Sequence, residues 1–188
     1  HWTEGYADMI QKGIGGKVVR FHVLANSDSE ADQTLKLAVR DRVLQEYGDL
    51  LETCTSKEET LAALKNAQQE ISETAEAEVL AQGYTYPVRV SLVREEFPFK
   101  KYGDLIFPAG VYDALRIEIG EAKGKNWWCV LYPQMCYVDA AWGYSTEESH
   151  VRLQNTLTKE EFLVVSAMEQ KKVAPKIKCR LVELWSER

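Results

Sequence analysis

KVVRFHVLANSD, residues 17–28, is the stretch that decides the predicted fold. Apolar residues alternate along most of its first eight positions, which is typical of a β-strand. One face of that strand carries the apolar residues Val19, Phe21 and Val23. The other face carries Arg20 and His22. A strand that buries only its first face does not require an arginine and a histidine at alternate positions of the second face. Arg20 and His22 are therefore candidate site residues.

The strand continues into a polar corner, Ala25-Asn26-Ser27-Asp28, whose residue types favour turns and helix caps. Ser27 and Glu30 have the spacing of a capping box, which predicts that a helix begins here. Free backbone N–H groups and the helix dipole make such a corner suitable for an anionic group. Asn26 and Asp28 could equally do no more than cap the helix. The sequence leaves both interpretations open.

Length and charge limit the class of protein. The 188 residues suffice for one well-packed domain, which we place at 17–188 after a loosely held, flexible lead-in at 1–16. The net charge of −6 argues against nucleic acid or an anionic membrane surface as the main partner. No apolar run approaches the roughly 18–20 residues that span a bilayer, so we expect no membrane insertion. Because the chain starts at His1, any signal or anchor segment would lie upstream.

The remaining periodicity alternates between helical and strand patterns. Helical stripes over 29–51 and 56–82, with a short connection, predict an antiparallel helix pair. Strand patterns follow at 86–93, 104–119 and 127–132, where 104–119 is expected to form a hairpin around Pro108-Ala109-Gly110. Short links between these strands predict a meander.

The C-terminal part completes the predicted fold. Residues 145–154 are polar and are expected to form a loop or an insertion. Thr158 with Glu161 opens a third helix that Pro175 ends, and residues 177–181 have the pattern of a last strand. The predicted class is α+β, a mostly antiparallel sheet of about five to six strands. The helix pair and the C-terminal helix are expected to pack on this sheet.

No motif for catalysis or for a cofactor is present. The histidines are isolated from one another and from cysteines, so we predict neither a metal site nor another cofactor. Cys129 and His22 could in principle pair as nucleophile and base. Cys129 lies in an apolar strand, however, where a cysteine is usually a small core residue. No catalytic residue is predicted.

Several polar and aromatic residues lie on or beside apolar segments and form the candidate binding surface. Charged side chains in such places are costly unless they are paired, so they either form one internal network or line one cleft. Trp127 and Trp128 point to opposite faces of a strand, and Trp127 is expected either to face outward or to be buried opposite Trp128. The candidates are Arg20, His22, Asn26, Asp28, Arg40, Arg116, Lys125, Asn126 and Trp127.

Three strings of residues carry a resemblance to a known family. They are RFHVLANSD at 20–28, YPVRV at 86–90 and GKNWWCV at 124–130. Together with the residues between them, they resemble stage II sporulation protein R of endospore-forming Firmicutes. The resemblance covers about residues 17–139 in order and becomes weak after Asp139.

The resemblance implies a function that no motif indicates. Members of this family are exported from the forespore into the space between the two membranes of the sporangium. There they activate a membrane-embedded aspartic protease that processes pro-sigma-E, which we interpret as activation by binding rather than by catalysis. Export would also permit a disulfide between Cys129 and Cys136, both of which match the family. The alternative is a secreted hydrolase, or a cell-wall or small-anion-binding module, that uses Arg20, His22, Asn26 and Asp28.

Overall fold

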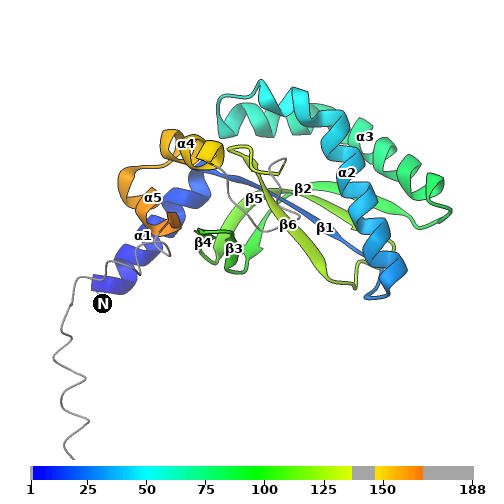
Figure 1. The fold of residues 1–188 in the computed structure, drawn as a ribbon, viewed down its shortest axis with the longest axis horizontal. Coiled ribbons are helices and arrows are strands. Elements are labelled where there is room, and N and C mark those ends of the chain that lie inside the picture. The colour runs from blue at the N-terminus through cyan, green and yellow to red at the C-terminus, as the bar shows by residue number, and fades with distance from the viewer. Residues whose placement is uncertain (1, 137–146, 167–188) are drawn as a thin grey trace, which may run out of the picture.

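The computed structural model describes residues 2–136 and 147–166, which form an α+β fold (Figure 1). Within these residues there are five helices, a four-stranded mixed sheet and a separate two-stranded sheet. The helices are α1 (Trp2–Lys17), α2 (Glu30–Glu52), α3 (Lys57–Ala81), α4 (Glu147–Thr156) and α5 (Lys159–Ser166). The strands are β1 (Val19–Leu24), β2 (Val88–Phe97), β3 (Lys100–Tyr102), β4 (Leu105–Phe107), β5 (Gly110–Ile119) and β6 (Asn126–Tyr132).

The first strand lies inside the main sheet, whose order is β2-β5-β1-β6. β1 runs parallel to β5 and antiparallel to β6, and β2 runs antiparallel to β5. The predicted meander is therefore wrong, because β1 separates β5 from β6. The predicted hairpin over 104–119 is also wrong, since β4 pairs with β3 around Gly103, whose φ of 60° suits a tight turn. Alternation along a segment fixes its two faces but not its partner strand.

Helices α2 and α3 cover one face of this sheet (Figure 1). Val19, Phe21 and Val23 are fully buried beneath them, as the alternation along β1 predicts. Helix α2 begins at Ser29 rather than at Ser27, because the Ser29 hydroxyl accepts from Asp32 N at 3.2 Å. The apolar stripes that were predicted for the two helices contribute to this core: Leu35, Val39, Val43, Tyr47 and Leu51 on α2, and Leu64, Ile71, Ala75 and Val79 on α3.

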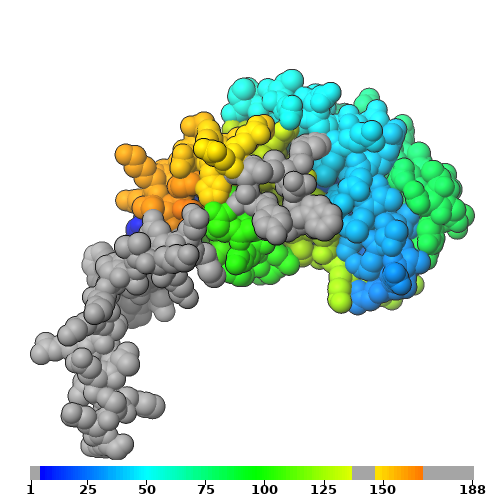
Figure 2. All heavy atoms as spheres, in the orientation of Figure 1, coloured from blue at the N-terminus to red at the C-terminus, as the bar shows by residue number. Residues whose placement is uncertain are grey.

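The opposite face of the sheet is covered at one end by a second core. This core joins residues of α1, α4 and α5 to β4 and to the far face of β2, β5 and β6. Figure 2 shows α4 and α5 at one end of the molecule and α2 and α3 at the other. Residues 147–154, which were expected to be a loop, belong to α4, whose Leu153 is fully buried. The predicted third helix begins as expected, since Thr158 and Glu161 exchange capping hydrogen bonds. The expected strand at 177–181 and the stop at Pro175 lie outside the described residues.

The N-terminal segment differs from the flexible lead-in that the sequence suggested. Residues 2–17 form α1, and Ile10 and Ile14 are buried in the second core. The glycines that indicated a loop permit close packing instead. A Cβ on Gly15 would lie 2.6 Å from the Val111 carbonyl oxygen of β5, and one on Gly13 would overlap the Glu161 carboxylate of α5. Glycine at these positions lets the helix approach the sheet and α5.

The substitution Gly15→Ala tests this contact. We expect it to be less stable than Gly16→Ala by about 1–3 kcal/mol, the usual cost of forcing an extra group into a packed site. Gly16 is the matched control, because it lies in the same helix and a Cβ there would meet nothing within 4 Å. Urea unfolding followed by circular dichroism measures both variants. Equal stability of the two would show that α1 does not pack this closely on β5.

Candidate functional site

The nine candidate residues lie in three groups, and Asn126, the first residue of β6, pairs with Leu24 of β1 next to the third group. Arg20, His22 and Arg116 project from the face that α2 and α3 leave uncovered. The corner residues Asn26 and Asp28 lie at the end of β1 beside the turn between β5 and β6, and Arg40, Lys125 and Trp127 lie where α2 meets β6. The structure therefore does not bring the candidates together as one network or one cleft.

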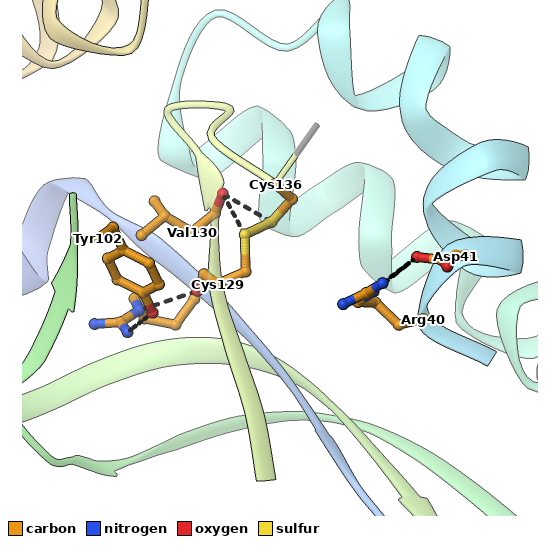
Figure 3. The surroundings of a disulfide bond; sticks show 7 residues. Arg40, Asp41, Tyr102, Cys129, Val130 and Cys136 are labelled. Carbon is orange, nitrogen blue, oxygen red and sulfur yellow. Dashed lines mark hydrogen bonds and ion pairs between the residues drawn. A yellow bond between two sulfur atoms is a disulfide. The ribbon is translucent and has the colours of Figure 1, made fainter. Parts of the chain in front are cut away.

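Arg20 is fully buried, and the groups that contact its guanidinium are neutral. Its Nε donates to the Cys129 carbonyl oxygen at 3.1 Å and its Nη2 to the Tyr102 hydroxyl at 2.9 Å; Figure 3 shows Tyr102 beside Cys129. The guanidinium also lies 4.8–5.9 Å from the centres of four aromatic rings, a geometry in which the ring faces attract a cation. Those rings belong to Phe97, Tyr102, Phe107 and Tyr112. Arg20 thus fastens the β3–β4 hairpin to the main sheet.

His22 lies next to a charged pair on the same face. Arg116 Nη1 donates to Glu95 Oε2 at 3.0 Å. His22 Nε2 lies 2.6 Å from Glu95 Oε1, but the two atoms form no hydrogen bond. Burial, together with the charges of Arg116 and Arg20, lowers the pKa of His22 to about 3. The neutral ring stacks on Trp128 at 4.8 Å. An imidazole with this pKa is a weak general base at neutral pH.

This environment predicts a specific dependence of stability on pH. Because the pKa of His22 is about 3 in the folded chain and 6.5 as a model value, the unfolded chain binds the extra proton between these values. The contribution of His22 is thus fully present above pH 6.5 and is lost as the pH falls towards 3. We expect the wild type to lose up to roughly 1.4 kcal/mol per pH unit more than His22→Phe below pH 6.

Urea unfolding at a series of pH values between 7.5 and 4 measures this difference, in which acid effects common to both proteins cancel. His150→Gln, on α4, is the control for removing a histidine elsewhere. Parallel curves for the wild type and His22→Phe would contradict a buried, neutral His22.

The polar corner at the end of β1 joins two turns of the chain. Asn26 Nδ2 donates to Asp32 Oδ2 at 2.9 Å, and Asn26 Oδ1 accepts from Glu121 N at 2.9 Å. Asp28 Oδ1 accepts from Lys125 N at 2.7 Å. Hydrogen bonds from Ser27 and Asn26 lower the pKa of Asp32. The corner therefore already contains two carboxylates of the protein itself, at the place where the sequence suggested an external anion.

The substitution Asn26→Ala tests the strength of this corner. It removes the bonds to Asp32 and to Glu121 N, and we expect a loss of about 1–2 kcal/mol in the free energy of unfolding. Lys123→Ala is the control, because that side chain lies in the same turn and is 75% exposed. Chemical denaturation of both variants gives the two values. A cost no greater than that of Lys123→Ala would mean that the corner does not hold the turn.

Lys36, Arg40, Lys125 and Trp127 form a second cluster, which we call the basic edge. The Arg40 guanidinium lies 4.7 Å from the centre of the Trp127 ring and forms an ion pair with Asp41 at 2.7 Å (Figure 3). Lys36 Nζ donates to the Lys125 carbonyl oxygen at 2.9 Å. Burial lowers the pKa of Lys36, and the neighbouring charges of Arg40 and Lys125 add to this effect.

The two tryptophans pack on opposite faces of β6. Trp127 lies against the core under α2 and α3 and meets Phe21 edge-on at 5.6 Å, whereas Trp128 packs with the second core. Both remain partly exposed. Of the two alternatives for Trp127, the structure has the one in which the rings pack on both sides of the sheet.

Cys129 and Cys136 are joined by a disulfide with an S–S distance of 2.08 Å (Figure 3). It connects β6 to the segment that follows this strand. Cys54 is a free thiol, and Cys179 lies outside the residues that the structure describes. Residues 2–136 and 147–166 contain no group of three or more His, Cys, Asp or Glu side chains that could hold a metal ion. Over the same residues, every helix is too short or too polar to cross a membrane.

Comparison with known proteins assigns the family. The family model for stage II sporulation protein R matches residues 15–142. The chain belongs to this family. It is 32% identical over 184 residues to stage II sporulation protein R of Bacillus subtilis (strain 168), an alignment that covers 93% of this chain and 82% of that protein. No solved structure matches the chain.

Sequence reasoning did not include Glu95 and Lys36 among the candidates, although both belong to the clusters described above. Glu95, the partner of Arg116, shares a face with it only through the register of β2 against β5. Lys36 is spaced for a helical surface pair with Asp32, yet it contacts Lys125. The spacing of Lys36 and Arg40 on one helix face was the available signal for the basic edge.

Proposed function

We propose that this chain is an exported signalling protein of sporulation that activates a membrane-embedded aspartic protease, which in turn processes pro-sigma-E. Its site of action is the space between the forespore and mother-cell membranes. The observation that carries the proposal is membership of the stage II sporulation protein R family over most of the chain. The protease is the proposed partner, and the chain needs no cofactor for this role.

Two contacts in the structure support activation by binding rather than by catalysis. The sulfur of Cys129, the candidate nucleophile, is held in a disulfide and cannot act as a thiolate. His22, the candidate base, is buried with a pKa of about 3. The alternative of a secreted hydrolase that uses His22 gains no support from this geometry. A binding protein activates an enzyme when it has higher affinity for the active state and so shifts the population towards it.

The basic edge is the surface that we assign to this contact. It places an exposed Lys125 and a partly exposed Trp127 beside Arg40 and Lys36, whose side chains are largely buried, on a protein whose net charge is −6. Such a local cationic patch attracts an acidic surface of a partner, and large aromatic side chains often carry much of the binding energy. Trp127 and Arg40 already stack, so the patch is partly ordered before binding.

Co-expression of this chain with the protease and pro-sigma-E, scored by cleavage of pro-sigma-E, tests the proposal. We expect Arg40→Ala and Trp127→Ala to lower cleavage about fivefold or more, since interface anchors typically cost at least 1 kcal/mol on truncation. Lys65→Ala, on the exposed side of α3, is the control.

Circular dichroism and thermal unfolding establish that each variant folds. If Trp127→Ala does not fold, Arg40→Gln takes its place. Full activation by both folded Arg40→Ala and folded Trp127→Ala would eliminate this surface, and no cleavage with the wild type would eliminate the function.

A further inference from the structure

The outer edge of β2 presents free backbone groups in a defined register. Gly120 N donates to the Pro87 carbonyl oxygen at 2.8 Å, and Pro87 lies opposite Gly120 in the continuation of the β2–β5 ladder. Hydrogen-bonded and non-bonded pairs alternate in an antiparallel ladder. The odd-numbered residues of β2 therefore bond to β5, and the even-numbered residues direct N–H and C=O outward.

A side chain from α3 agrees with this register. Gln68 Nε2 donates to the carbonyl oxygen of Val90, an even-numbered residue, at 3.0 Å. No strand of the described part of the chain pairs with this edge. The outward backbone groups of Leu92, Arg94 and Glu96 are therefore available to another strand.

A hollow lies beside the C-terminal half of this edge. Arg94 and Glu96 line it from β2, and residues of α1 and of the turn before β5 complete it: Ala7, Asp8, Gln11, Lys12, Pro108, Ala109, Gly110 and Val111. The apolar part of this lining includes Val111, whose side chain is exposed. A free strand edge next to a partly apolar hollow is the arrangement by which many domains bind an extended peptide.

The charges in the hollow indicate what such a peptide should carry. Asp8 forms an ion pair with Lys12 at 2.7 Å, and Arg94 forms one with Asp113 at 3.0 Å. Glu96 is exposed and forms no ion pair with the described residues. Asp113 is shared between Arg94 and Lys57, so the edge carries charges of both signs. Glu96 is the carboxylate among them that a lysine or arginine of an added strand can pair with.

We propose that an extended segment of a partner protein, bearing a lysine or arginine that pairs with Glu96, adds to β2 as a fifth strand of the main sheet. This inference rests on the proposed function, because it adds a second contact between this chain and the protease that it activates. The N–H and C=O groups of Arg94 and Glu96 bond to the segment, and alternate side chains of the segment enter the hollow. The charged side chains of β2 disfavour indiscriminate pairing with other strand edges.

A proline substitution at an outward-facing residue of β2 tests the free edge without removing a hydrogen bond of the main sheet. Arg94→Pro removes one outward donor and leaves the bonds to β5 in place, because the N–H of Arg94 does not belong to that ladder. Arg94→Ala is the matched reference, since it loses the same ion pair with Asp113 and keeps the N–H. In the co-expression assay we expect cleavage to be about tenfold lower with Arg94→Pro than with Arg94→Ala. Glu96→Pro against Glu96→Ala repeats the comparison at the next outward residue.

Amide hydrogen exchange on the wild-type protein adds a measurement that needs no variant. Protection of the amides of Arg94 and Glu96 on addition of the detergent-solubilised protease is expected. Equal cleavage with the folded proline and alanine variants, or unchanged exchange at both amides, would overturn this inference. The proposed function would still stand in that case, provided that the wild type activates the protease. No activation by the wild type would instead overturn both. A wild-type dimer that becomes monomeric in Arg94→Pro by sedimentation would identify a second copy as the occupant and so also overturn it.

Discussion

The buried guanidinium of Arg20 is the constraint on which the second layer of the structure depends. Removing a charge from water costs several kcal/mol unless other groups compensate for it. Here the compensation comes from two neutral acceptors and from ring faces on β2, β3, β4 and β5. Because these groups come from separate strands, they surround the guanidinium only when the β3–β4 hairpin lies on the sheet, and its Nη1 forms no hydrogen bond with the described residues. A single side chain on β1 therefore links the placement of the hairpin to the assembly of the central strands.

The division of β1 into two faces was predictable, whereas its place in the sheet was not. Alternation placed Phe21 and Arg20 on opposite faces, and the structure agrees. The parallel pairing of β1 with β5 joins segments almost a hundred residues apart, and the local pattern contains no information about that register. The glycines at 13 and 15 illustrate the same difficulty. They indicate a loop when read locally, but their missing Cβ atoms allow α1 to pack against β5 and α5.

The sequence predicted one group of candidate residues, and the structure places them in separate parts of the fold. Arg40, Lys125 and Trp127 do lie near one another, because α2 returns along β6 beside the start of that strand. Arg20, His22 and Arg116 are separated from them by the sheet itself. Asn26 and Asp28 hold the turn between β5 and β6, and Arg20 bonds to Cys129 and Tyr102. Of the family string RFHVLANSD, only His22 has both polar side-chain atoms buried without a hydrogen bond to the described residues. Residues that match a family pattern can thus act mainly by fixing the scaffold.

The basic edge lies at β6 and the free edge at β2, which are the two edge strands of the main sheet. β1 and β5 separate them, which corresponds to roughly 15 Å for three strand spacings. One short loop of a partner cannot reach both surfaces, so a partner that uses both must present two separate elements at a fixed distance. Two weak contacts held in this way bind far more tightly than either alone, because the second forms at a high effective concentration. A state of the partner in which the two elements are wrongly spaced then loses most of the affinity, which is the differential binding that activation by population shift requires.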